Sequence, residues 1–155
     1  DFFSEDGQAG ISASNRIRGV VLHDVLSRMR VAGDLKEAVR ASVLSGELTA
    51  VEAEEVETLL AGQIAKVDER GWFRDDDAVV LNETSLIDSD GQIYRPDRVM
   101  IRDGRVVIID YKFGEHDPRY ERQLKKYAGI WRRMGHEDVS AFLWYVHTGE
   151  IVFVI

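Results

Sequence analysis

Two aspartates and a lysine flank a tight-turn sequence in the second half of the chain. Asp103-Gly104 separates two apolar runs, and both residues tolerate the positive φ angles that a two-residue hairpin turn requires. Counting outward from such a turn places Asp97 opposite Asp110, and Lys112 leaves the same strand face as Asp110. The spacing therefore predicts two carboxylates and an ammonium group at one end of a hairpin.

Directly opposed aspartates repel each other, because their Cβ atoms lie about 5 Å apart. At an effective dielectric constant of about 20 the repulsion is roughly 3 kcal/mol, more than a favourable cross-strand pair returns. A divalent cation bound by both carboxylates would reverse the sign of this interaction. The alternative is a looser turn with both aspartates as solvated strand-end charges. Pro96 cannot donate to a strand ladder, so a bulge or strand end is expected beside Asp97.

The composition is that of one globular domain, with 155 residues of which 45% are hydrophobic and 31% charged. The chain has no apolar run or leader pattern that would predict membrane insertion or secretion. It has no cysteine, which excludes disulfides, cysteine-bound zinc and an iron–sulfur cluster within the chain and fits a cytoplasmic location. The start at Asp1 and the apolar end suggest a domain excised from a longer protein.

The charge is unevenly distributed. The net charge of −8 argues against a nucleic-acid partner when taken as a sum. Residues 1–90 carry a balance of −10, whereas residues 91–155 carry a balance of +2. The candidate site therefore lies in the basic half of the chain.

The first half reads as helical, over residues 12–70. Ser14 or Asn15 could cap a helix at residues 17–29, and a second helix is predicted at residues 34–45. A third begins with a capping box at Thr49, and its predicted core stripe consists of Val56, Leu59, Leu60 and Ile64.

The second half, residues 72–155, changes to a strand period. Strands are predicted at residues 78–87, 93–101 and 105–112, with a turn at Asp90-Gly91. A basic helix follows from Asp117 to Gly135, and then a strand at residues 139–147 and one more after a turn at residues 148–150. This order predicts an α/β (α+β) fold with a central mixed sheet flanked by helices.

Three short motifs occur in an order that resembles a known nuclease family. They are Gly19-Val20-Val21-Leu22-His23 on the first helix, Pro96-Asp97 with Asp110-Tyr111-Lys112 on the hairpin, and Gln123 with Tyr127 on the basic helix. This set resembles the RecB-like branch of the PD-(D/E)xK superfamily, the nuclease domain of UvrD/AddA/RecB-type helicase–nucleases. The resemblance covers about residues 16–147 and implies a restriction-endonuclease-like fold.

The resemblance implies metal-dependent hydrolysis of DNA phosphodiesters. By analogy, Asp97, Asp110, His23 and the backbone carbonyl of Tyr111 would hold one or two Mg²⁺ or Mn²⁺ ions, and Lys112 would assist the attacking water. Carboxylate, carbonyl and water oxygens are the ligands that these ions prefer. Glu83, on the first strand, is a further candidate. A two-residue turn at Asp90-Gly91 would pair Glu83 with Arg98, whereas a bulge or longer loop would bring it to Asp97.

The basic helix carries the predicted DNA contacts. Gln123 and Tyr127 are i,i+4 neighbours and match the family's Q-x-x-x-Y motif, although Tyr127 could equally pack in the core. Arg119, Arg122 and Lys126 fall on one stripe suited to phosphate contacts, and a solvated helix face explains that stripe as cheaply.

The expected partners are DNA, single-stranded or as an unwound duplex end, and a helicase domain in the same polypeptide, with a second nuclease–helicase subunit beyond it. The activity would serve double-strand-break processing and recombination in a bacterial cytoplasm. Two alternatives stay open: a non-catalytic module that binds DNA or acts as a scaffold, and a related nuclease that acts on RNA or branched DNA. The missing cysteines set aside the iron–sulfur members of the branch.

Overall fold

The computed structural model describes residues 19–155 and divides the chain into two compact units, each described by itself. The helical unit holds the described residues up to Asp75, with Lys112–Gly114 and Val146–Gly149. The sheet unit holds Asp76–Tyr111, Glu115–Tyr145 and Glu150–Ile155. Within residues 19–155, no helix has the length and apolar character needed to cross a membrane.

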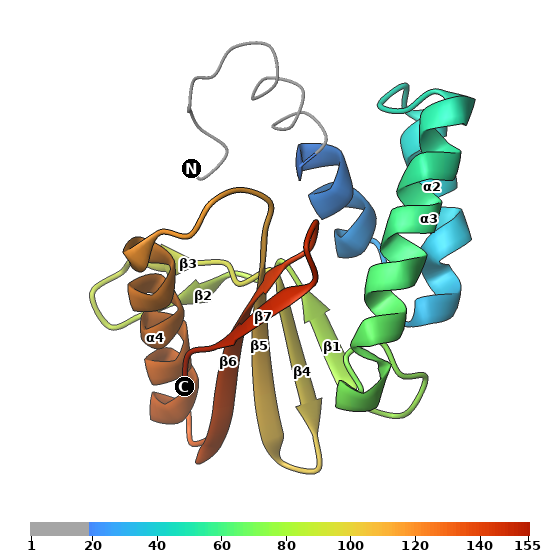
Figure 1. Cartoon of the computed structure of the whole chain (residues 1–155). Helices are drawn as coiled ribbons and strands as arrows, with labels where there is room; N and C mark the ends of the chain where they lie inside the picture. The colour runs from blue at the N-terminus through green and yellow to red at the C-terminus, as the bar shows by residue number, and fades with distance from the viewer. Residues whose placement is uncertain (1–18) are drawn as a thin grey trace. The chain divides into compact units, whose positions relative to one another are not determined.

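The helical unit begins with a helix whose described part spans residues 19–27. This confirms the first predicted helix, whose candidate caps Ser14 and Asn15 lie outside the described residues. Its apolar stripe is fully buried at Val25, Leu26 and Met29. The other helices of this unit are η1 (Ala32–Asp34), α2 (Leu35–Leu44), α3 (Ala50–Lys66) and η2 (Asp68–Arg70) (Figure 1).

A capping box starts α3, as predicted. The Glu52 N–H donates to Thr49 Oγ1 over 3.1 Å, and the Thr49 N–H donates to Glu52 Oε1 over 2.9 Å. These reciprocal bonds satisfy two backbone donors that the first turn of a helix leaves without a partner. Val56, Leu60 and Ile64 form the buried stripe, and Leu59 at its edge is half-buried.

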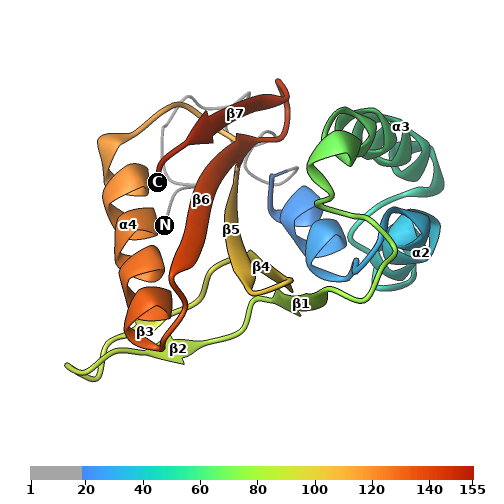
Figure 2. The same ribbon diagram turned by 90° about the horizontal axis from the view of Figure 1, so that it is seen from below.

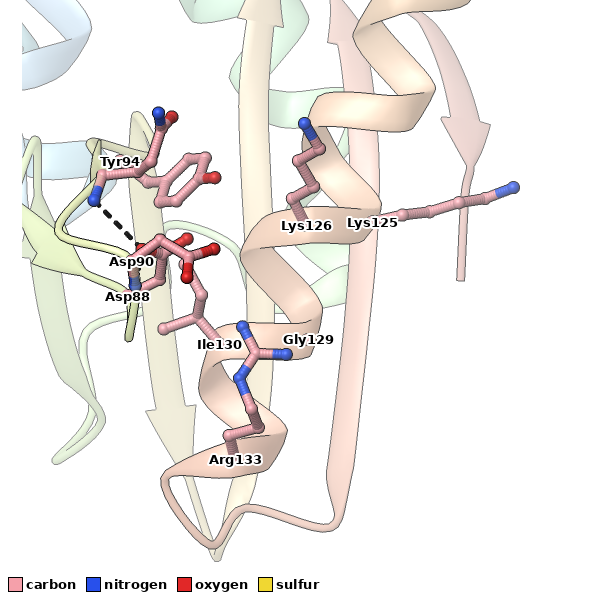
Figure 3. A pocket seen from close by; sticks show the side chains of 9 residues that line it. Asp88, Asp90, Tyr94, Lys125, Lys126, Gly129, Ile130 and Arg133 are labelled. Atoms are coloured by element: carbon pink, nitrogen blue, oxygen red, sulfur yellow. Dashed lines mark hydrogen bonds between the residues drawn. The ribbon is translucent and has the colours of Figure 1, made fainter.

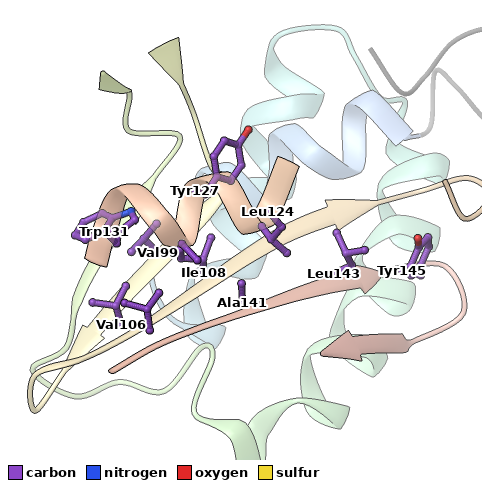
Figure 4. Packing of buried hydrophobic residues seen from close by; sticks show 11 residues of the cluster. Val99, Val106, Ile108, Leu124, Tyr127, Trp131, Ala141, Leu143 and Tyr145 are labelled. Atoms are coloured by element: carbon purple, nitrogen blue, oxygen red, sulfur yellow. The ribbon is translucent and has the colours of Figure 1, made fainter. Parts of the chain in front are cut away.

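The sheet unit contains a five-stranded sheet in the order β1-β4-β5-β6-β7 (Figures 1 and 2). Its strands are β1 (Val79–Asn82), β4 (Arg98–Arg102), β5 (Arg105–Lys112), β6 (Asp138–Tyr145) and β7 (Glu150–Phe153). The β1–β4, β4–β5 and β6–β7 pairs are antiparallel. β5 and β6, joined through helix α4, run in the same direction, so the sheet is mixed as predicted (Figure 4).

The β4–β5 hairpin has the predicted register. Val99 pairs with Ile108 and Arg102 pairs with Arg105. Asp103 has φ 53° and Gly104 has φ 79°, which is the pair of positive angles of a type I′ turn. This turn matches the right-handed twist of the strands, and it fixes every pairing down to the aspartates.

The preceding hairpin differs from its prediction in two ways. Each predicted strand is split, giving β1 and the short β2 (Leu86–Ile87) on one side, and β3 (Ile93–Tyr94) and β4 on the other. The turn is also wider than the predicted two residues, because the Asp88 N–H donates to the Gln92 carbonyl over 3.0 Å. Three residues therefore form the loop, with Gly91 in the left-handed region at φ 81°.

Helix α4 (Pro118–Arg133) packs on one face of the sheet and supplies four residues of the buried core between them (Figure 4). Asp117 caps it by accepting the Arg119 N–H over 2.9 Å, and Pro118 occupies the first turn, as predicted. The buried cluster between helix and sheet consists of Val99, Val106, Ile108, Leu124, Tyr127, Ala128, Trp131, Val139, Ala141, Leu143 and Tyr145. The side chains of Asp97 and Asp110, at the end of the β4–β5 hairpin away from its turn, therefore lie on the face of the sheet that α4 covers.

Candidate active site

Two backbone-to-carboxylate hydrogen bonds hold Asp97 and Asp110 together across the β4–β5 hairpin. The Asp97 N–H donates to Asp110 Oδ1 over 3.2 Å, and the Tyr111 N–H donates to Asp97 Oδ2 over 2.7 Å. The β4 ladder begins at Arg98, so Asp97 lies just beyond its end and opposite Asp110 in the same register. The sequence prediction that these two carboxylates oppose each other is confirmed, and so is the strand end beside Pro96.

Both aspartates are buried. Asp97 is 9% exposed and Asp110 is 4% exposed, so the alternative of solvated strand-end charges is wrong. Two backbone N–H groups offset part of the repulsion between the carboxylates, since a hydrogen bond to a charged group contributes about 1.5–3 kcal/mol. The pair is therefore held in place by the hairpin backbone itself.

This donor set fits a hard divalent cation. Within residues 19–155, no group of three or more His, Asp or Glu side chains converges on a common point. Mg²⁺ is commonly held by one or two carboxylates, and water or substrate phosphate completes its shell. Asp97 and Asp110 satisfy that requirement as a pair, with the Tyr111 carbonyl next along the same strand.

Lys112 is the last residue of β5 and is only 1% exposed. Its backbone carbonyl accepts the Val146 N–H over 3.0 Å, which fixes this end of the strand. Strand alternation gives its side chain the same sheet face as Asp110. A lysine is rarely this buried unless its ammonium group is paired. Burial of Lys112 therefore has a free-energy cost that specific interactions must offset.

The Tyr111 side chain lies on the opposite face from Asp110 and serves packing. Its ring meets Trp144 edge to face, with centroids 5.8 Å apart. Burial raises the pKa of Tyr111 well above its ordinary value, and the Asp97 and Asp110 charges add to this increase while Arg98 opposes it. The phenol therefore stays protonated, and only the backbone carbonyl is suited to a cation.

Tyr127 borders the aspartate pair from α4. Its hydroxyl is hydrogen-bonded to the Arg95 backbone N–H, and its ring meets Tyr94 edge to face at 5.5 Å. Burial raises the pKa of Tyr127, and the negative charges of Asp110 and Asp97 raise it further. Tyr127 is thus both a core residue, as one reading of the sequence predicted, and a neighbour of the carboxylates.

The other predicted α4 residues differ in their surroundings. Gln123 and Lys126 are exposed. Arg119 is exposed too, but its guanidinium group bonds the Asp117 carboxylate at 2.6 Å and 3.1 Å. Arg119 is therefore occupied in holding the helix start, whereas Lys126 makes no hydrogen bond or ion pair within the described part of the chain.

Glu83 lies beside Asp97 in the register, and not beside Arg98. The Glu83 N–H donates to the Asp97 carbonyl over 3.1 Å, and Asn82 pairs with Arg98. The pairing with Arg98 that a two-residue turn predicted is wrong by one residue, because the loop at Asp88–Gln92 is longer. Glu83 ends β1 with φ 53°, so its side chain leaves the regular alternation.

His23 belongs to the helical unit and lies on the first helix. Its side chain is 16% exposed, and Nδ1 is 3.9 Å from Asp24 Oδ1. Gly19, one turn earlier on the same helix, is buried.

Two residues around the site were missed by sequence reasoning. Tyr94 packs against Tyr127, and Arg98, fully buried, lies next to Asp97 and bonds the Asn82 carboxamide oxygen over 3.4 Å. A charged residue within the predicted strand was a signal for Arg98, because a buried guanidinium requires partners. Tyr94 had no such signal, since the chain is irregular between it and Asp97.

Comparison with known proteins gives one family. The model of the PD-(D/E)XK nuclease superfamily matches residues 4–153. No curated protein sequence matches the chain significantly. The mixed five-stranded sheet flanked by helices agrees with the restriction-endonuclease-like fold of that superfamily.

Proposed function

The chain belongs to the PD-(D/E)XK nuclease superfamily, and we propose that it is a divalent-metal-dependent deoxyribonuclease. The observation that carries the proposal is the buried Asp97–Asp110 pair, interlocked through backbone N–H groups on adjacent strands. The site supports hydrolysis of a phosphodiester bond, because that reaction needs negative ligands for a cation beside a cationic group for the transition state.

The residues divide this work by their chemistry. Asp97, Asp110 and the Tyr111 carbonyl would hold Mg²⁺ or Mn²⁺. The ion, when bound, supplies Lewis-acid stabilisation of the phosphate and lowers the pKa of a coordinated water. Lys112 would orient the attacking water and offset the negative charge that develops on the phosphate. Gln123 and Tyr127 would align the strand at the α4 side.

The finer proposal is a nuclease that receives DNA from an attached helicase, in the manner of RecB-like enzymes, during break processing. The charge distribution supports this, since an acidic first half gives the domain little affinity of its own for DNA. A tethered motor would raise the local concentration of the strand and replace that affinity. The isolated chain should then cleave DNA weakly, and fusion to a helicase should increase the rate on duplex ends.

The Asp110→Asn variant tests the site. It keeps the shape of the side chain and removes its charge, so we expect cleavage of single-stranded DNA in Mn²⁺ to fall about a hundredfold or more. Lys112→Met should cause a comparable loss. Asp103→Asn makes the same substitution at the exposed turn of the same hairpin, where Asn also tolerates positive φ, and should retain parental activity.

Equal cleavage by the Asp110→Asn and Asp103→Asn proteins would show that the site is wrongly assigned. A parallel digestion of single-stranded DNA, duplex DNA, a branched junction and RNA would separate the deoxyribonuclease from the related activities. Preferential cleavage of RNA or of the junction would replace the proposed substrate.

A further inference from the structure

A groove lies within the sheet unit between α4 and the β2–β3 hairpin (Figure 3). It has a volume of about 530 Å³, within the size range of small-molecule sites. The helix lines it with Lys125, Lys126, Gly129, Ile130 and Arg133, and the hairpin lines it with Asp88, Asp90, Gln92 and Tyr94. A space of this size encloses only a short stretch of one strand.

The lysines of the groove have no ion-pair partner within the described part of the chain. Lys125 and Lys126 are exposed and make no hydrogen bond or ion pair with any residue in 19–155. Positive side chains that line a groove and lack a protein partner are typical of sites that contact phosphate.

Two acidic residues, Asp88 and Asp90, also line the groove, so its three cationic side chains exceed its carboxylates by one. Asp88 has a structural task. The Asp88 carboxylate accepts the Asp90 N–H over 2.8 Å, the Gln92 N–H over 3.0 Å and a hydrogen bond from the Tyr94 hydroxyl. Although partial burial works against it, these donors, together with the Arg133 charge, lower the pKa of Asp88. Asp88 therefore holds the hairpin wall in shape and orients Tyr94, and its charge is largely satisfied by its own loop.

Gly129 keeps the helix side of the groove open. Glycine in the middle of a helix costs about 1 kcal/mol relative to alanine, so its presence calls for a local reason. A Cβ added to Gly129 would lie 3.4 Å from Arg133 Nη1. The missing side chain leaves the Arg133 guanidinium group room to lie along the groove.

The groove adjoins the aspartate site through two aromatic rings. Tyr94, in its wall, contacts Tyr127 at 5.5 Å, and Tyr127 lies within the field of Asp97 and Asp110. We propose that this groove binds the phosphodiester backbone of a single nucleic-acid strand and directs it to the Asp97–Asp110 pair, an inference that rests on the proposed function. Lys126 and Arg133, two turns of helix apart, contact successive stretches of the backbone, and Tyr94 supports a base.

Charge reversal within the groove tests this directly. In the full chain with EDTA present to prevent cleavage, fluorescence anisotropy with a labelled DNA oligonucleotide measures affinity at several salt concentrations. We expect Lys126→Glu/Arg133→Glu to weaken single-strand binding by roughly tenfold or more and to reduce the salt slope by about 1.4, from two lost phosphate contacts. The matched control is Lys36→Glu/Arg40→Glu, the same charge change on exposed residues of α2, which should bind as the parent does.

A steric variant separates groove occupation from net charge. Gly129→Leu fills the groove without changing charge and should weaken binding by a similar factor. Gly62→Leu is its control, because Gly62 also lies within a helix but faces open space. Parallel titrations use RNA of the same sequence and the annealed duplex.

The outcomes are distinct for the two proposals. If both groove variants bind the strand as tightly as the parent, the groove is not the binding site, even if Asp110→Asn still abolishes cleavage. Duplex bound as tightly as single strand, with the same dependence on Lys126 and Arg133, would overturn the single-strand assignment. If the groove variants bind more weakly but the parental chain shows no metal-dependent cleavage, strand binding by the groove would be supported and the proposed nuclease activity would be wrong.

Discussion

Tyr127 shows how one side chain can serve both stability and a site. It is 4% exposed and packs in the core beneath α4, yet its hydroxyl reaches the Arg95 backbone next to the aspartates. A buried phenol at this point limits water around Asp97 and Asp110, which strengthens the attraction of the pair for a cation.

The Tyr127→Phe variant should lose stability more than activity. Removing the hydroxyl takes away the hydrogen bond with the Arg95 N–H, so the free energy of unfolding should fall by about 0.5–1.5 kcal/mol. Cleavage should fall less than tenfold, because the ring and both aspartates remain. Urea unfolding and single-turnover cleavage measure the two effects. A large loss of cleavage with parental stability would instead mean that the hydroxyl contacts the reacting strand.

The elements around the site differ in how far sequence could predict them. The Asp103-Gly104 turn fixed the β4–β5 register, so the opposed aspartates followed by counting. The Asp90-Gly91 turn did not, because the same dipeptide also suits a three-residue loop, and one extra residue shifts every pair. For this reason Glu83 lies opposite Asp97 and not opposite Arg98, as a two-residue turn would place it.

Tyr94 could not be predicted from strand alternation. Residues 83–85 and 95–97 are irregular on both paired strands, between Asn82↔Arg98 and Leu86↔Tyr94. Beyond this break, the alternation of side chains between the two faces is shifted by one residue. Val99, at an odd position, and Tyr94, at an even position, therefore both pack against the same core. Pro96 signals the break on the second strand, but the sequence holds no local signal for the matching break at residues 83–85.

The start of α4 should depend on pH. Hydrogen bonds from the Arg119 side chain and backbone lower the pKa of Asp117 from 3.8 to about 2. A lowered folded-state pKa stabilises the protein above the unfolded value and loses that effect as the pH falls through the folded one. Asp117→Asn should lower the thermal midpoint at pH 7, by no more than about 2–4 °C because the pair is exposed.

This difference should close between about pH 4 and pH 2, where the parental carboxylate becomes protonated. Thermal melts of both proteins across that range measure it. A gap that stays constant down to pH 2 would mean that the Asp117 charge does not act on the helix. Glu137→Gln, which removes one negative charge from an exposed residue outside the helix, is the matched control.

At the scale of the whole chain, metal binding should be linked to folding. The ligands converge only in the folded hairpin, so a cation that binds there stabilises the native state by mass action. Mn²⁺ at a hundredfold excess over its dissociation constant should raise the free energy of unfolding by about 2.7 kcal/mol. Asp110→Asn should abolish this increase, and Asp103→Asn should preserve it. Calorimetric titration without heat from Mn²⁺ in the parent would favour a non-catalytic module.

The two backbone hydrogen bonds to the aspartate carboxylates also provide two spectroscopic reporters. The amide protons of Asp97 and Tyr111 each point at a carboxylate oxygen of the proposed cation site. Any ion that draws electron density from those oxygens weakens both hydrogen bonds and moves the two amide resonances together. Nuclear magnetic resonance could therefore follow cation binding at this one point of the backbone, without substrate and without turnover.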